Sequence, residues 1–161
     1  MLADWLEALE ATALASALRD SVWVYPLVNT GHILGVALLV GSIVPLDLRL
    51  LCAWRTVPLG PLWRVLTHTA AAGLGLAVVF GSLLFITRAT EYVESRFFVA
   101  KMAVVVAATL NALALRIVVP DEVAEMQPGA GRPSRRLRVA GGISLAAWLT
   151  ALALGRLVGY F

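Results

Sequence analysis

Four long apolar stretches dominate the chain, and each has the length of a helix that crosses a membrane. They cover residues 22–46, 62–86, 97–118 and 137–159. About 20 consecutive apolar residues span a bilayer core as an α-helix. Trp23 and Tyr25 stand at the start of the first stretch, as in an interfacial aromatic belt. The pattern predicts an all-α fold: a bundle of four transmembrane helices in a lipid bilayer, forming a single membrane domain over residues 1–161.

The segment before the first stretch has a different pattern. In residues 2–19 apolar side chains recur at helical spacing, and the acids Asp4, Glu7 and Glu10 fall between them. This predicts a short N-terminal amphipathic helix. Such a helix either lies at the membrane interface, with Trp5 inserted, or forms a cap packed on the bundle outside the membrane. The sequence leaves both alternatives open.

The connections between the spans carry most of the turn residues and charges. Residues 120–135 are rich in proline, glycine and arginine, which predicts a loop, and Pro120 is expected to end the third helix. Asp47 and Arg49 follow the first span and are expected to form an interfacial ion pair. The connection between the second and third spans is expected to be a solvated loop of balanced charge, with Arg88, Glu91, Glu94 and Arg96.

Composition supports the membrane assignment and excludes nucleic-acid binding. The chain is 60% hydrophobic and 14% charged, against roughly 45–50% and 25% in soluble domains. Of its 13 basic residues, eight lie in or beside the connections between spans 1 and 2 and between spans 3 and 4: Arg49, Arg55, Arg64, Arg116, Arg132, Arg135, Arg136 and Arg138. The positive-inside rule places these connections in the cytoplasm and both termini outside it.

Glycines recur within three of the spans and favour close helix packing. They are Gly31, Gly35 and Gly41 in the first, Gly73, Gly75 and Gly81 in the second, and Gly141 and Gly142 in the fourth. Small residues let helix backbones approach one another in a membrane. They serve equally well inside one bundle or between the copies of a homo-oligomer, and the interpretation within one bundle is favoured.

Five polar side chains inside the spans are the candidate functional residues: Asn29, His32, His68, Lys101 and Asn111. A polar or ionisable group in a membrane helix is costly and therefore suggests function. The two histidines are the only ones in the chain, and neutral imidazole is an axial ligand of haem iron. Both are therefore predicted haem ligands, with Asn29 and Asn111 as hydrogen-bond partners. The alternative is that each histidine bonds a neighbouring helix.

The expected depths complicate a single haem held by both histidines. At 1.5 Å per residue, His32 lies roughly 12–15 Å from the outer edge of its span, and His68 roughly 6–9 Å from the inner edge. In a core about 30 Å thick the two would differ in depth by about 10 Å. Lys101 is closer in depth to His32. It could extend outward to the interface, pair with a haem propionate, or ligate iron.

Three segments resemble a known group of bacterial membrane proteins. "WVYPLVNTGHILGVALLVGSIVPLDLRLL", "HTAAAGLGLAVVFGSLLFITRA" and "SRFFVAKMAVVVAATLNALALR" look like the first three helices of small inner-membrane proteins known only as a domain of unknown function. More distantly, the layout is similar to the copper resistance protein D domain and to the HemJ-type protoporphyrinogen oxidase. The latter resemblance implies a b-type haem protein in which His32 and Lys101 are the residues that matter.

These observations lead to three functional hypotheses. The first is a b-type haem protein that transfers electrons to or from a quinone or a redox protein. The second is a cofactor-free membrane subunit or scaffold. The third is copper handling, which is disfavoured because only Met102 of three methionines lies in a span and Cys52 is the single cysteine. No nucleophile with a nearby base is evident, so hydrolase chemistry has no support.

Overall fold

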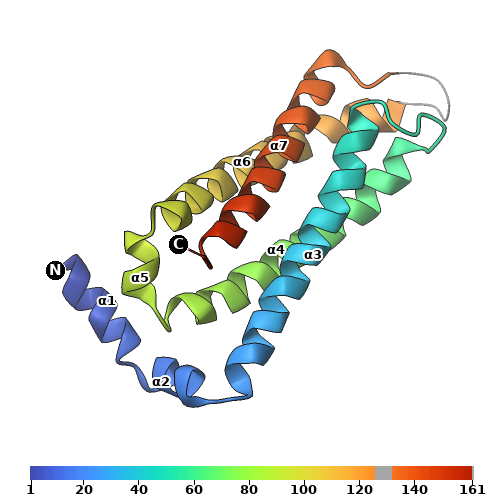
Figure 1. The fold of residues 1–161 in the computed structure, drawn as a ribbon. Coiled ribbons are helices and arrows are strands. Elements are labelled where there is room, and N and C mark those ends of the chain that lie inside the picture. The colour runs from blue at the N-terminus through green and yellow to red at the C-terminus, as the bar shows by residue number, and fades with distance from the viewer. Residues whose placement is uncertain (126–131, 161) are drawn as a thin grey trace.

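In the computed structural model, which describes residues 1–125 and 132–160, every element is an α-helix. Four helices are long and apolar enough to cross a membrane: α3 (Val24–Leu50), α4 (Leu59–Phe85), α6 (Arg96–Glu125) and α7 (Arg135–Leu157). Three are short: α1 (Leu2–Glu10), α2 (Ala13–Asp20) and α5 (Ala89–Glu94). Figure 1 shows the four long helices as an elongated bundle. The predicted all-α, four-span architecture is confirmed.

Two helices are longer than the sequence predicts. Helix α3 contains Pro45 and continues to Leu50, and α6 continues to Glu125. The prediction that Pro120 ends the third helix is therefore wrong. A proline removes one backbone N–H, but in a long membrane helix the remaining ladder can continue on both sides of it. The predicted loop over 120–135 begins after Glu125, and its residues 126–131 lie outside the described residues.

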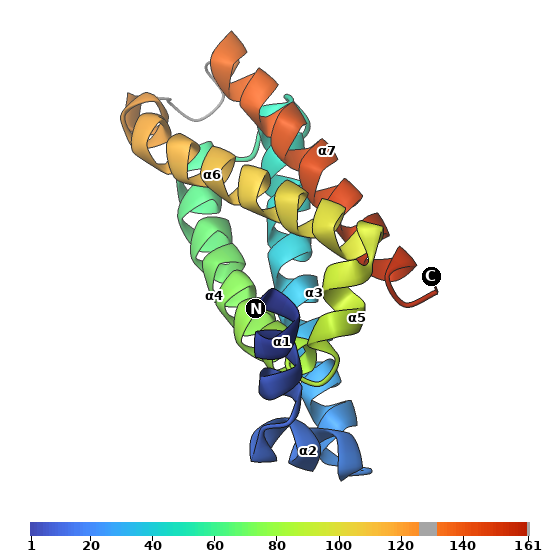
Figure 2. The same cartoon turned by 90° about the vertical axis from the view of Figure 1, so that its left-hand side faces the viewer.

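The long helices form two antiparallel pairs. Helix α3 packs along α4, and α6 packs along α7. Helix α3 also packs on α7, whereas α4 and α6 touch very little. Figures 1 and 2 show that the α3–α4 and α6–α7 connections lie at one end, which we call the loop end. The chain termini and α5 lie at the other end, the terminal end.

The α3–α4 pair is held by contact between backbones. A Cβ atom added to Gly35 would lie 2.5 Å from the backbone nitrogen of Ala77, and one added to Gly73 would lie 2.5 Å from that of Leu39. Only glycine fits at these two crossing points, because a side chain would overlap the facing helix. These glycines therefore act within one bundle. Gly41 and Gly75, by contrast, face open space.

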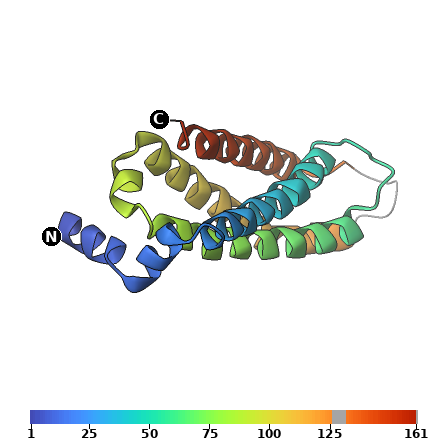
Figure 3. The same ribbon diagram turned by 60° about the horizontal axis from the view of Figure 1, so that its bottom comes forward.

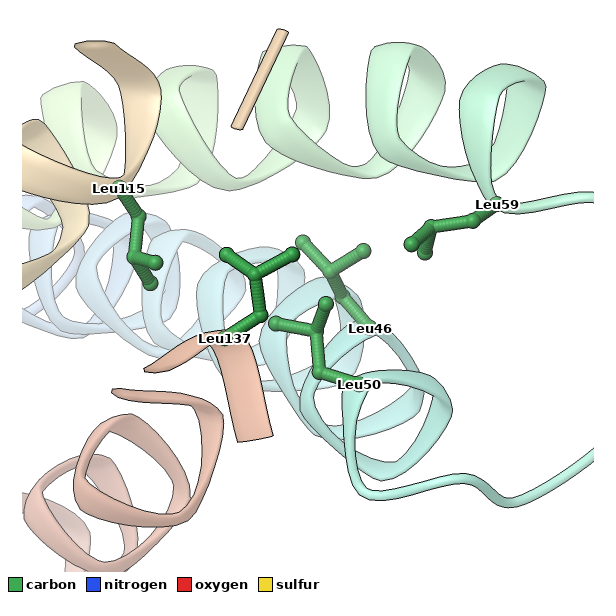
Figure 4. Close-up of a cluster of buried hydrophobic side chains, with 5 residues drawn as sticks. All are labelled: Leu46, Leu50, Leu59, Leu115 and Leu137. Atoms are coloured by element: carbon green, nitrogen blue, oxygen red, sulfur yellow. The ribbon is translucent and has the colours of Figure 1, made fainter. Parts of the chain in front are cut away.

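A cluster of leucines closes the loop end. It joins all four long helices, and Figure 4 shows the side chains pointing toward one another. Leu50 is fully buried and Leu137 nearly so. The cluster consists of Leu46, Leu50, Leu59, Leu115 and Leu137. It fixes the spacing of the helices beside the charged connections.

The N-terminal segment forms two helices rather than the single helix predicted over residues 2–19. The break follows Glu10, and the Thr12 side chain caps α2 by accepting a hydrogen bond from the backbone N–H of Ala15 at 3.3 Å. Cap formation at Thr12 favours a new helix start over continuation. Figure 3 shows α1 and α2 extending from the terminal end, before α3 begins.

Both N-terminal helices are tied to the connection between α4 and α6. The Thr90 backbone N–H donates to the Glu10 carboxylate at 2.7 Å, and the Arg19 guanidinium donates to the Thr87 carbonyl at 3.0 Å. The hydrogen bond from Thr90 lowers the pKa of Glu10. Trp5 remains 62% exposed. The segment therefore has the contacts expected of a cap on the bundle.

Candidate functional site

His32 lies in the interface between α3 and α4. Its Nδ1 is 2.9 Å from the carbonyl oxygen of Ala77, and the ring packs against Gly81, where an added Cβ would lie 3.0 Å from Cε1. Because a carbonyl only accepts, Nδ1 carries the proton in this hydrogen bond. The Nε2 atom is then the unprotonated nitrogen, and no described residue bonds it. A fixed tautomer with a free Nε2 is the arrangement of a metal-binding histidine.

His68 has a different environment. It is exposed, and its Nδ1 lies 2.6 Å from the carbonyl oxygen of Arg64, one turn earlier in the same helix. Nine residues separate it from Ala77, which at about 100° per residue places it on the opposite side of α4 from α3. His68 therefore makes no hydrogen bond to another described helix.

The two histidines also lie at different depths. Leu39 of α3 packs beside Gly73 of α4. His32 lies seven residues from Leu39 toward the terminal end, and His68 lies five residues from Gly73 toward the loop end. Their separation along the pair is about 18 Å at 1.5 Å per residue. The structure does not bring the two histidines to one site.

Lys101 lies at the terminal end of α6 and reaches toward α7. Its Cδ atom is 3.5 Å from the position of a Cβ on Gly155, and its Nζ lies 5.1 Å from the centre of the Phe98 ring. Contact of the ammonium with an aromatic face stabilises the cation. Lys101 thus lies toward the same end of the bundle as His32, and no described hydrogen bond joins the two residues.

Of the two asparagines, Asn29 lies one turn before His32 in the same helix, and Asn111 lies in α6. Asn29 is exposed on α3 and makes no hydrogen bond to the described residues. The Asn111 side-chain amide donates to the carbonyl oxygen of Ala140 at 3.3 Å, which links α6 to α7. Neither asparagine contacts a histidine through a hydrogen bond. Asn111 has the structural role of an interhelical tie.

Asp47 and Arg49 do not form the ion pair that the sequence suggested. The Arg49 guanidinium turns toward the α3–α4 connection, donating to the carbonyls of Val57 at 2.8 Å and Arg55 at 3.3 Å. Asp47 points the other way, and Ser144 of α7 is its hydrogen-bond partner. Two residues apart on a helix, the side chains diverge by about 200°, so each finds its own partner.

Sequence reasoning missed a cavity around Asp47. It has a volume of about 120 Å³ and is lined by all four long helices, half of the lining being leucine and alanine. Two buried polar atoms in its walls have no hydrogen-bond partner, the Asp47 Oδ2 and the Trp148 Nε1. Ending the first span at residue 46 placed Asp47 outside the membrane. Its spacing of one helical turn from Ile43 was the signal that it belongs to the buried face.

No family model matches the chain, and neither a curated protein nor a solved structure does. The resemblance drawn from the three quoted segments therefore stays an expectation, and the functional argument rests on the residues themselves.

The geometry provides one well-placed imidazole for a haem, not two. His32 has a fixed tautomer and a free Nε2, while His68 lies about 18 Å along the pair and on the far side of α4. Among the described residues no group of three or more His, Cys, Asp or Glu side chains could hold a metal ion. His32 is therefore the one described imidazole whose geometry suits an axial ligand.

Proposed function

We propose that this chain is an integral membrane b-type haem protein that transfers electrons within the bilayer, with His32 as its axial ligand. The observation that carries the proposal is the hydrogen bond between His32 Nδ1 and the Ala77 carbonyl, at 2.9 Å. Such a second contact orients a ligating imidazole and raises its basicity. A bound haem would supply one-electron chemistry, at a potential set by its ligands and its burial.

The chain's own residues would hold the ligand and balance charge around it. The close packing of Gly81 against the His32 ring limits the ring's rotation. Lys101, toward the same end of the bundle as His32, provides a positive charge that suits an anionic carboxylate, such as a propionate. The pairing of α3 with α4 through Gly35 and Gly73 fixes the height of His32 in the bundle. Ligand orientation thus follows from helix packing.

The test is a pyridine haemochrome assay on detergent-purified protein, together with oxidised and dithionite-reduced spectra. We expect stoichiometric haem b in the wild type, no haem in His32→Ala, and unchanged haem in His68→Ala. The His68 variant is the matched control, because it removes the other imidazole of the chain. A colourless wild type that stays colourless after haem reconstitution would overturn the proposal. Loss of haem in both variants would overturn the assignment of a single histidine ligand.

One observation favours a second candidate function, that of a cofactor-free membrane subunit. The His32–Ala77 hydrogen bond already links α3 to α4, and interhelical bonds of this kind occur without any ligand. In that case His32→Ala would lower the free energy of unfolding by about 1–2 kcal/mol and leave the spectrum of the protein unchanged.

We propose further that the protein lies in a bacterial inner membrane with its loop end in the cytoplasm. The supporting observation is the concentration of arginine in the connections at that end. Cys52, the single cysteine, lies in the α3–α4 connection and is partly exposed. A membrane-impermeant maleimide should label it in inverted membrane vesicles and not in intact spheroplasts. The reverse labelling would invert the topology.

A further inference from the structure

The cavity beside Asp47 crosses the bundle where its packing is weakest. Its walls include members of the leucine cluster at the loop end and, deeper in the bundle, Leu39, Ile43 and Trp148. It also spans the seam between α4 and α6, the two helices that touch very little. Leu113, which lines the cavity from α6, is 51% exposed. The cavity therefore opens through this seam toward the surrounding lipid.

Two buried atoms in the walls require a partner that the chain does not supply. Asp47 is 2% exposed and Trp148 is 3% exposed, and both the Asp47 Oδ2 and the Trp148 Nε1 lack a hydrogen bond. No described cation forms an ion pair with Asp47. Arg49 bonds the loop carbonyls, and Arg116, which lines the cavity from α6, is largely exposed and has no ion pair with a described residue. Buried polar groups in proteins are nearly always satisfied, so this pair indicates a ligand.

A hydroxyl group has both the donor and the acceptor that these atoms require. Its O–H would donate to the Asp47 Oδ2, and its oxygen would accept from the Trp148 Nε1–H. An amine would serve Asp47 but has no acceptor for the tryptophan when it is protonated, and a carboxylate has no hydrogen to donate to Asp47. The complementary ligand is therefore neutral and carries a hydroxyl.

The rest of the ligand follows from the walls. Trp63 and Trp148 offer aromatic surfaces, and the remaining lining is chiefly leucine and alanine. A volume of about 120 Å³ is close to that of apolar cavities that take up one benzene ring. A longer apolar tail could leave through the α4–α6 seam into the lipid. A membrane-soluble phenol meets each of these conditions.

We infer that this cavity binds the aromatic head of a hydroquinone, with its hydroxyl between Asp47 and Trp148 and its tail in the α4–α6 seam. The inference deepens the proposed electron-transfer function by naming the class of electron carrier, and its physiological use rests on that function. Binding itself depends only on the cavity residues.

Equilibrium binding of decylhydroquinone, whose ring carries no further substituents, to the detergent-purified full chain, measured by isothermal titration calorimetry, tests the inference. The dimethyl ether of the same compound is the matched ligand, because it keeps the ring and tail and lacks both hydroxyl donors. We expect the wild type to bind the quinol at least about tenfold more tightly than the ether, the difference expected from one hydrogen bond to a charged group.

Two conservative variants probe the two orphan atoms. Asp47→Asn and Trp148→Phe should each weaken quinol binding about tenfold or more, while Ser82→Ala, an exposed position on α4, should leave it unchanged. Far-UV circular dichroism checks that each variant is folded. The inference would be overturned if quinol and ether bind equally, if neither variant has an effect, or if no binding is seen. The cavity would then hold only water.

The outcomes separate this inference from the proposed function. Quinol binding by a wild type that holds no haem would sustain the cavity assignment and remove the haem protein. If the protein holds haem that depends on His32 but binds quinol no better than the ether, the haem proposal is sustained and the cavity assignment is removed.

Discussion

The two helix pairs of this bundle are built in different ways. Along α3 and α4, glycine brings the backbones into contact, with an added Cβ on Gly73 only 2.5 Å from a facing backbone nitrogen. The α6–α7 pair has side-chain links such as the Asn111–Ala140 hydrogen bond. In their most apolar stretches, 44% of α3 is buried within the bundle and only 6% of α6.

The α3–α4 pair is therefore the rigid part of the bundle, and the contact between α4 and α6 is the part that can adapt. Backbone contact at Gly35 and Gly73 fixes the α3–α4 pair and with it the position of His32. Helix α6 has few neighbours besides α7, so its contacts with α4 can open without breaking a tightly packed interface. The candidate ligand cavity lies at this second boundary. Measurements that perturb each pair separately would sharpen the contrast.

The largest effect is expected at the α3–α4 crossing. Gly73→Ala places a methyl group against the backbone of Leu39, so the helices must move apart. We expect a loss of about 3 kcal/mol in the free energy of unfolding, at the upper end for overpacking. The measurement is unfolding in SDS-containing mixed micelles, followed by circular dichroism.

Gly75→Ala is the matched control in the same helix, because its added Cβ faces open space. It should be neutral or stabilise by up to about 1 kcal/mol, since alanine is the better helix former. Equal effects of the two substitutions would show that the crossing is looser than the structure has it.

A smaller effect is expected where Arg49 holds the α3–α4 connection. Arg49→Met keeps the aliphatic stem and leaves the Val57 carbonyl without its donor, which should cost about 2 kcal/mol. Cys52 should also react faster with maleimide, because the connection loosens. Arg55→Met, on an exposed arginine, should change stability by less than about 0.5 kcal/mol. Similar labelling rates in both variants would contradict the role given to Arg49.

The α6–α7 pair should respond more weakly. Asn111→Leu removes the bond to the Ala140 carbonyl, and single interhelical hydrogen bonds in membranes average about 0.6 kcal/mol. We expect a loss of that order in the SDS titration. A loss of unfolding free energy as large as that of Gly73→Ala would show that the two helix pairs are held equally tightly, which would contradict the contrast between them.

The smallest effect concerns the contact of α1 with α5. The pKa of Glu10 is lowered in the folded chain, so the deprotonated side chain stabilises the contact above its ordinary pKa of 4.5 and stops doing so as the pH falls through the lowered value. The protection factor of the Thr90 amide, which is its hydrogen exchange corrected for the intrinsic pH dependence, should therefore fall in acid. Glu10→Gln should abolish this pH dependence, and an unchanged profile would show that another group causes it.

Much of the fold follows from the sequence, because long apolar runs have few alternatives in a bilayer. All four spans were predicted, with ends within a few residues of the helices except beyond Pro45 and Pro120. Those ends escaped because proline is a weaker helix terminator in a membrane helix than the pattern assumes. The break after Glu10 was missed because Thr12 forms a cap that helical periodicity does not register.

The site was predictable only in part. His32 and Lys101 lie toward the same end of the bundle, as their positions in the spans predict. Periodicity could not show which face of each helix packs against which neighbour, because α3 is apolar almost all round. For that reason the outward orientation of His68, and the cavity that joins Asp47 to Trp148, became visible only when the helices were packed.

The contacts of the N-terminal helices have a consequence for biosynthesis. Glu10 and Arg19 bond residues 90 and 87, which are separated from them by 80 and 68 positions in the chain. A ribosome completes α1 and α2 first, but their partners emerge only after α3 and α4 have been made. The segment at the start of the chain must therefore wait, undocked, until two spans have entered the membrane. Its docking marks a late step in assembly.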